Sequence, residues 1–164
     1  MSQSLAQFTG ASLYLDTMIP YALLRGLDPA AQALFTRIQA GELVAYTSAL
    51  TFDELAYRLL LALIRDHYGS SPLDRLRTDE ANMIAQFYPH VAPPLTQLQS
   101  FPNLTVVEVA SSDIEVMNNL ILRYHLKPRD ALHVAAMQKI NCVDLISHDA
   151  GFDRVPDLQR YTLT

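Results

Sequence analysis

The stretch SLYLD, residues 12–16, is a short apolar run that ends on Asp16. Its length and composition predict a β-strand at residues 12–15. A second run of the same kind, residues 143–146, is followed by Ser147, His148 and Asp149. Both predicted strands therefore end close to a carboxylate. The class of fold then follows from the secondary structure predicted for the residues between the two strands.

Between these two runs, helix-like and strand-like patterns alternate along the chain. Asp28-Pro29 predicts a helix start, because Asp caps helices and Pro fits the first helical position. Ser112 and Glu115 form a capping-box pattern that predicts another start. The proline-rich residues 89–102 are expected to form a connection. Further strands are expected at residues 43–46, 104–109 and 160–163, and helices at about residues 28–40, 51–68, 73–88, 112–125 and 127–140.

Strands that alternate with helices predict a parallel β-sheet flanked by helices, the three-layer architecture of the α/β class. The 164 residues suffice for one domain with a sizeable core, so residues 1–164 are expected to form a single domain. Half of the residues are apolar, which is far from the composition of a disordered chain.

The formal net charge is −5, so the chain as a whole is not an electrostatic nucleic-acid binder. Contact with nucleic acid would need a local basic patch or bound metal ions. Cys142 is the only cysteine, which excludes an intramolecular disulfide and a cysteine-based zinc site. Residues 1–10 do not resemble a signal peptide, and the longest apolar run, residues 59–64, is too short to cross a bilayer. A soluble, cytoplasmic protein without membrane contact is therefore expected.

Four acids fall where ligands bind in folds of this class. Asp16 and Asp149 each follow a predicted strand, whereas Glu54 and Asp130 lie in the first turns of predicted helices. Ligands of parallel sheets sit outside the carboxyl ends of the strands. The four carboxylates are therefore expected to converge on one cleft.

Such a cluster is costly without a cation. Two carboxylates about 4 Å apart repel by roughly 4 kcal/mol at an effective dielectric constant near 20, and their pKa values would rise. A divalent ion removes this penalty, and oxygen ligands favour Mg²⁺ or Mn²⁺ over zinc. An ion of this kind suits phosphodiester hydrolysis. The candidate metal ligands are Asp16, Glu54, Asp130 and Asp149.

Each acid also has a structural alternative. Thr51 and Glu54 fit a capping box, and Asp130 would be favoured by a helix dipole. Asp149 fits a turn, and Asp16 could cap the segment that follows it. These roles do not exclude metal binding, because a capping acid can still face an ion. The joint pattern of four acids favours a metal site.

Four segments of the chain, taken in order, resemble the PIN-domain family, and within it the VapC-like toxins of toxin–antitoxin pairs. The most specific parts are the Asp-Ala-Leu-His and Ser-x-Asp-x-x-Phe-Asp patterns. The similarity covers nearly the whole chain, although residues 69–103 are longer than in compact members of the family. The segments are LYLDT at residues 13–17, TSALTFDEL at residues 47–55, RDALHVAA at residues 129–136 and ISHDAGFD at residues 146–153.

The resemblance implies a metal-dependent endoribonuclease that uses Mg²⁺ or Mn²⁺. Ser147 matches a hydroxyl residue that helps to order the site, and Asp153 matches an acid expected to orient the water or a second ion. The resemblance further implies an RNA substrate, a homodimer and a small antitoxin protein as a partner. By position, the family's acidic quartet corresponds to Asp16, Glu54, Asp130 and Asp149.

Two other functions stay open on the sequence alone. A degenerate PIN domain would act as a nucleic-acid-binding or protein-interaction module without catalysis. A phosphatase of the haloacid-dehalogenase type would need a second Asp two residues after the first, but the sequence reads Asp16-Thr17-Met18.

Several neighbours of the acids have expected roles of their own. His133 is expected to be a packed, hydrogen-bonded core residue rather than a ligand. Asp53 is expected to point away from Glu54, because adjacent helix residues do not share a face. Pairing with acids, rather than contact with RNA phosphates, is expected for the cations Arg123, Lys127, Arg129 and Arg154.

Overall fold

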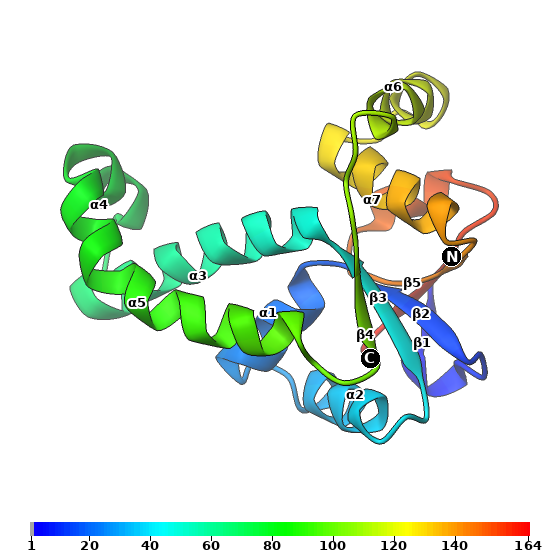
Figure 1. The fold of residues 1–164 in the computed structure, drawn as a ribbon, viewed down its shortest axis with the longest axis horizontal. Helices are drawn as coiled ribbons and strands as arrows, with labels where there is room; N and C mark the ends of the chain where they lie inside the picture. Colours follow the sequence, from blue (N-terminus) through cyan, green and yellow to red (C-terminus); the bar gives the residue numbers. More distant parts are fainter. Residues whose placement is uncertain (1) are drawn as a thin grey trace.

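A parallel sheet lies at the centre of the computed structural model, which describes residues 2–164 (Figure 1). Neighbouring strands follow the order β1-β6-β5-β2-β3-β4, and each described pair runs parallel. The predicted α/β class is thereby confirmed. The strands are β1 (Gln3–Ser4), β2 (Ser12–Leu15), β3 (Val44–Ser48), β4 (Leu104–Val107), β5 (Asp144–Ile146) and β6 (Gln159–Thr162).

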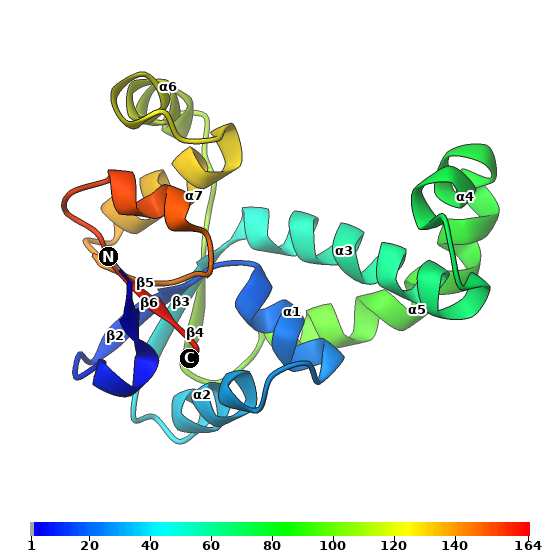
Figure 2. The same cartoon turned by 180° about the vertical axis from the view of Figure 1, so that it is seen from behind.

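Helices cover both faces of the sheet, as the three-layer prediction requires. Figures 1 and 2 show α6 and α7 on one face and α1 and α2 on the other, while α3 and α5 extend side by side away from the sheet toward α4. Among residues 2–164, none of the helices combines the length and apolar character that a membrane span requires. The helices are α1 (Met18–Arg25), α2 (Pro29–Gln39), α3 (Ala49–Tyr68), α4 (Pro72–Thr78), α5 (Glu80–Gln99), α6 (Asp113–Tyr124) and α7 (Pro128–Lys139), with short 3₁₀ helices η1 (Leu5–Gln7) and η2 (Ala150–Arg154).

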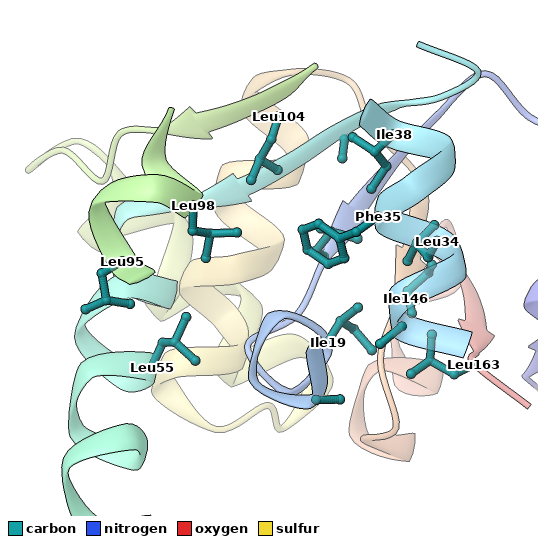
Figure 3. Close-up of a cluster of buried hydrophobic side chains, with 14 of the residues drawn as sticks. Ile19, Leu34, Phe35, Ile38, Leu55, Leu95, Leu98, Leu104, Ile146 and Leu163 are labelled. Carbon is teal, nitrogen blue, oxygen red and sulfur yellow. The ribbon is translucent and has the colours of Figure 1, made fainter. Parts of the chain in front are cut away.

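The apolar residues of β2 explain why both faces are covered. Leu13 and Leu15 are buried in one cluster with residues of α1, α2, α3 and α5, whereas Tyr14 is buried in a second cluster with α7. Figure 3 shows the first cluster, in which Ile19 of α1 and Phe35 of α2 take part. Successive strand residues point to opposite faces, so a continuous apolar run needs cover on both sides. Each such buried side chain stabilises the fold by roughly 1.5–3 kcal/mol.

The proline-rich stretch is helical, so the predicted connection at residues 89–102 is wrong. Helix α5 contains Pro89, Pro93 and Pro94. A proline inside a helix costs about 3 kcal/mol. Five apolar side chains on one stripe of α5 are buried against α3 and the core, which offsets that cost. Pro89 and Pro93 lie on the exposed side. The buried stripe consists of Met83, Phe87, Val91, Leu95 and Leu98.

Other boundaries differ in smaller ways. The helix predicted at residues 73–88 is two helices that meet at Asp79, whose backbone is not helical. The strand predicted at residues 104–109 ends at Val107. Strand β1 and helix α1 were not predicted, because β1 is only two residues long and α1 follows Asp16 with almost no connection.

Helix α3 begins two residues before its predicted start, and this removes one explanation of Glu54. Strand β3 leads directly into α3 at Ala49, so Thr51 lies inside the helix. The Thr51 hydroxyl accepts a hydrogen bond of 2.8 Å from the Thr47 hydroxyl and does not cap the helix. Thr51 and Glu54 therefore do not form the predicted capping box.

The capping box predicted at the start of α6 is also wrong. Ser112 precedes α6 but makes no side-chain capping bond. The carboxylate of Asp113, the first residue of α6, accepts the backbone N–H of Ala110 at 2.8 Å and the ammonium of Lys139 at 2.8 Å. These bonds tie the start of α6 to the preceding loop and to α7.

The order of the strands creates a switch point between β2 and β5. The chain adds β3 and β4 on one side of β2, and β5 and β6 on the other. Ligand sites in parallel sheets lie at such a point, outside the carboxyl ends of the strands. The backbone N–H of Asp16, after β2, donates to the carbonyl of Ile146, at the end of β5, at 3.1 Å. Asp16 and Ser147 therefore sit next to each other at this edge.

Candidate active site

A cleft of about 520 Å³ opens at this edge of the sheet. It is lined by all four acids that the sequence predicts as metal ligands, which come from four separate segments. Asp16 follows β2, Glu54 lies on α3, Asp130 lies on α7 and Asp149 precedes η2. The other lining residues are Thr17, Met18, Arg58, Lys127, Pro128 and Arg129.

Ser147 joins two of the acids. Its buried hydroxyl donates to Oδ2 of Asp16 at 2.6 Å and accepts the backbone N–H of Asp149 at 3.0 Å. The other oxygen of Asp16 accepts the backbone N–H of Thr17 at 2.7 Å. Hydrogen bonds thus hold the Asp16 carboxylate on both oxygens, and they set its position relative to Asp149.

Glu54 is held in its ionised form. The hydroxyl of Thr17 donates to Oε2 of Glu54, and Nη1 of Arg129 lies 3.5 Å from Oε1. Burial favours the neutral acid, but the facing His133 imidazole and the Thr17 hydroxyl outweigh burial and lower the pKa of Glu54 to about 2. Glu54 therefore presents a negative charge to the cleft at neutral pH.

Asp130 has the opposite environment. Its Oδ2 atom is buried and has no hydrogen-bond partner. Burial, together with the nearby charges of Asp149 and Asp16, raises the pKa of Asp130, although Lys127 opposes this shift. A buried polar atom normally has a partner. The Lys127 ammonium lies 3.7 Å from Oδ2 of Asp130, so among residues 2–164 this oxygen has a cationic neighbour but accepts no hydrogen bond.

Asp149 has two partners. Its Oδ1 accepts the backbone N–H of Gly151 at 2.7 Å, which caps η2, and its Oδ2 accepts the ammonium of Lys127 at 2.6 Å. These two donors lower the pKa of Asp149. The predicted turn role of Asp149 is confirmed, and the same carboxylate still lines the cleft.

The donor set of the cleft fits a divalent cation. One ligand atom each from Asp16, Glu54 and His133 lie within 4.8 Å of one another. Asp130 and Asp149 line the same cleft but are not part of this cluster, and within residues 2–164 Oδ2 of Asp130 accepts no hydrogen bond. Oxygen atoms dominate this set, and hard oxygen ligands suit Mg²⁺ or Mn²⁺. A cation would also offset the burial and the repulsion from Asp149 and Asp16 that raise the pKa of Asp130.

His133 is packed in the core, as predicted, but it also supplies one of the three ligand atoms of the cluster. It is buried, and its Nδ1 lies 2.9 Å from the hydroxyl of Tyr14. Its Nε2 lies 3.7 Å from Oε2 of Glu54 and has no hydrogen-bond partner. His133 therefore faces the acid cluster from within the core.

The cations near the acids follow the prediction in part. Lys127 and Arg129 pair with acids, and Asp53, which is 69% exposed, meets Arg129 at 3.5 Å outside the cleft. Asp53 thus points out of the cleft, as expected, although the Arg129 guanidinium that it meets also lies 3.5 Å from Oε1 of Glu54. In the described part of the chain, Arg123 and Arg154 pair with no acid, contrary to the prediction. Arg123 lies over the ring of Tyr124, and Arg154 donates to the carbonyl of Gly151 at 3.1 Å.

Asp153 does not line the cleft. Both of its oxygens accept hydrogen bonds from Arg160, at 2.7 and 2.9 Å. The same guanidinium donates to the carbonyl of Ser147 at 3.0 Å. Arg160 is buried, so this contact links Asp153 to the site through Ser147 and not through the cleft itself.

Sequence reasoning missed two polar residues of the cleft, Thr17 and Arg58. Thr17 directly follows Asp16, so the sequence could have placed it near the site. Its hydrogen bond to Glu54 could not be predicted from the sequence. Arg58 lies one turn after Glu54 on α3, and residues four apart share a helix face. That spacing was the available signal for Arg58.

Comparison with known proteins identifies the domain type. Residues 13–158 match the PIN domain. A VapC ribonuclease of Mycobacterium bovis and ribonuclease VapC13 of Mycobacterium tuberculosis are each 39% identical to this chain over 56 residues. The matched stretch covers 34% of this chain and 43% of each relative, which is less than half of their length.

Solved structures share the fold. VapBC2 from Rickettsia felis, bound to a DNA fragment from its promoter, has a TM-score of 0.59 at 13% identity and covers 92% of this chain and 98% of that one. A toxin–antitoxin complex from Klebsiella pneumoniae has a TM-score of 0.53 at 18% identity, covering 94% and 98%. VapC20 of Mycobacterium tuberculosis, a toxin that cleaves the sarcin-ricin loop, has a TM-score of 0.55 at 17% identity, covering 88% and 95%.

Proposed function

Because this chain belongs to the PIN-domain family, we propose that it is a metal-dependent endoribonuclease that hydrolyses RNA phosphodiester bonds. One observation carries the proposal. Acids from four separate segments line a single cleft, and one of their buried oxygens, Oδ2 of Asp130, accepts no hydrogen bond from residues 2–164. The choice of RNA as substrate rests on the ribonuclease relatives.

The proposed ligands of the ion are the four acids, and the ion is Mg²⁺ or Mn²⁺. When bound, such an ion lowers the pKa of a water molecule and offsets negative charge that develops on the phosphate. The ligands Asp16 and Asp149 are held in place by Ser147, and Glu54 by Thr17. Preorganised ligands lose little freedom when the ion arrives, which favours binding.

The substrate strand is proposed to meet the cations on the lining of the cleft. Arg58 and Arg129 are exposed side chains on α3 and α7 that line it. Guanidinium groups bind phosphate oxygens with two parallel hydrogen bonds. Such a local basic contact reconciles nucleic-acid binding with the overall charge of −5.

We propose a positioning role for Asp153. It fixes Arg160, whose contact with the carbonyl of Ser147 supports the residue between Asp16 and Asp149. Removal of the Asp153 carboxylate is then expected to weaken metal binding through Ser147 and to leave the charge of the cleft lining unchanged.

The test is the Asp16→Asn variant. An amide keeps the shape of Asp16 but removes its charge, so cleavage of an RNA substrate in Mg²⁺ or Mn²⁺ should be lost while the thermal melting curve stays cooperative. Asp74→Asn is the matched control, because Asp74 is an exposed acid on α4 that lies outside the cleft. Metal-dependent cleavage by a folded Asp16→Asn variant at the wild-type rate would refute the proposal.

The solved neighbours support a biological setting. Two of them are described as VapBC2 and as a toxin–antitoxin complex. We propose that this chain is the toxin of such a pair, acting in the cytoplasm as one domain and as a homodimer, with a small antitoxin protein as its partner. Expression of the chain should then stop growth, a small gene should lie beside its own, and co-expression of that gene should restore growth. Growth arrest that persists in the Asp16→Asn variant would contradict the link to the cleft.

A further inference from the structure

The cleft already holds a cation of its own, the ammonium of Lys127. Lys127 directly precedes α7, and its Nζ lies 2.6 Å from Oδ2 of Asp149 and 3.7 Å from Oδ2 of Asp130. Both oxygens belong to acids that the proposed metal site uses. The lysine therefore contacts one proposed ligand atom and lies near a second.

We propose that Lys127 is a displaceable counterion that sets the metal affinity of the cleft. Its ammonium neutralises Asp149 in the absence of a divalent ion and has to leave Oδ2 when the ion binds. The inference rests on the proposed metal site, and it adds a residue that competes for that site.

The hydrogen bonds of Asp149 make the competition direct. Its Oδ1 is committed to the backbone N–H of Gly151, which caps η2. Oδ2 is therefore the oxygen that can turn to a metal with the least disturbance of that cap, and Oδ2 is the atom that Lys127 contacts. An ion that uses Asp149 therefore meets Lys127 at the same oxygen.

The exposure of Lys127 makes displacement easy. Its side chain is 67% exposed, and exposed ion pairs made by long, flexible side chains contribute little stability. The Asp153–Arg160 pair nearby shows the contrast, because Arg160 is buried and donates to both oxygens of its partner. The structure thus contains one fixed pair beside the site and one pair that can open.

The charges of the lining point the same way. Four carboxylates face three cationic side chains on the cleft, those of Arg58, Lys127 and Arg129. The charge of Arg154 also reaches Asp149 and Lys127. Removal of the Lys127 charge leaves the cleft more negative and frees Oδ2 of Asp149, so both effects strengthen metal binding. Arg154 stays in place and limits the gain.

The experiment is a calorimetric titration of the full chain with MnCl₂ and with MgCl₂. Lys127→Met should bind the ion up to about fivefold more tightly than wild type, the scale set by an exposed ion pair that has to open when the ion binds. Lys127→Arg keeps the charge and should stay close to wild type. Arg37→Met is the matched control, because it removes one positive charge from an exposed pair with Glu42 on α2, away from the cleft.

The outcomes separate this inference from the proposed function. If wild type binds the ion and Lys127→Met binds it no more tightly, the counterion role is refuted and the metal site stands. An equal gain in Arg37→Met would also refute it, because net charge alone would then explain the change. If neither wild type nor any variant binds an ion, the metal site itself is refuted, and the inference falls with it. Lys127→Gln repeats the test if Lys127→Met does not melt cooperatively.

Discussion

Replacement of Ser147 by Ala should damage stability and metal binding together. The hydroxyl of Ser147 is fully buried, donates to Oδ2 of Asp16 at 2.6 Å and accepts the backbone N–H of Asp149 at 3.0 Å. A hydrogen bond to a charged group contributes about 1.5–3 kcal/mol, and a buried donor left without a partner costs about 1–3 kcal/mol. Asp16 is only partly buried, so water recovers part of the loss. The free energy of unfolding should therefore fall by about 3 kcal/mol.

Urea unfolding at neutral pH in the presence of a chelator measures this change without any contribution from metal. For a chain of this length, 3 kcal/mol corresponds to a lower melting temperature by about 6–12 °C. Calorimetry with MnCl₂ should show about tenfold or greater loss of affinity, because Asp16 and Asp149 are no longer held relative to each other. Ser70→Ala, in an exposed turn, is the control for both measurements. A Ser147→Ala variant within about 0.5 kcal/mol of wild type, an effect typical of surface substitutions, would refute the reasoning.

Three further substitutions test other parts of the structure. Arg58→Gln should raise KM for RNA about tenfold with little change in kcat, and it should reduce the slope of log binding constant against log salt concentration by about 1. Arg65→Gln, on the exposed side of the same helix, is the control and should change neither quantity. An unchanged salt slope for Arg58→Gln would exclude a phosphate contact. Asp113→Asn should cost about 2 kcal/mol at neutral pH, because hydrogen bonds from Lys139 and the Ala110 N–H are weakened. Those two donors lower the pKa of the Asp113 carboxyl from 3.8. Its contribution to the free energy of unfolding is therefore present above pH 3.8 and is lost as the pH falls through the lowered pKa, so acid should destabilise Asp113→Asn less than wild type. Parallel curves of unfolding free energy against pH for the two proteins would contradict this. Pro93→Ala should stabilise the chain by about 2 kcal/mol in urea unfolding, because Pro93 is an exposed proline inside α5, and a loss of stability would show that the proline is needed there.

The site could be predicted in outline because its acids follow local signals. Asp16 and Asp149 come after apolar runs that form β2 and β5, and the carboxyl ends of parallel strands share one edge. Asp130 comes two residues after Pro128, the first residue of α7. Because Pro favours the first position of a helix, the sequence could place Asp130 in the first turn. These are features of chain segments of a few residues, so they can be recognised without knowledge of the rest.

The arm formed by α3 and α5 shows the limit of such signals. Pro89, Pro93 and Pro94 favour a loop when only local preference is considered. The stripe of buried side chains on α5 packs on α3 and the core, and this long-range contact outweighs the local preference. The hydrogen bond from Thr17 to Glu54, 37 residues apart, is of the same nature. Neither could be inferred until both partners had been placed.

The order of residues along the chain determined the class of fold and the four acids that meet at one edge, because periodicity and helix starts depend on neighbours in sequence. Only the tertiary structure decided how each acid is held. It gave Asp149 the ammonium of Lys127, left Oδ2 of Asp130 without a hydrogen bond from residues 2–164, and turned Asp153 toward Arg160. The physical reason is that charge and hydrogen bonding act over a few ångströms in space, and the groups that share that space are distant in the sequence.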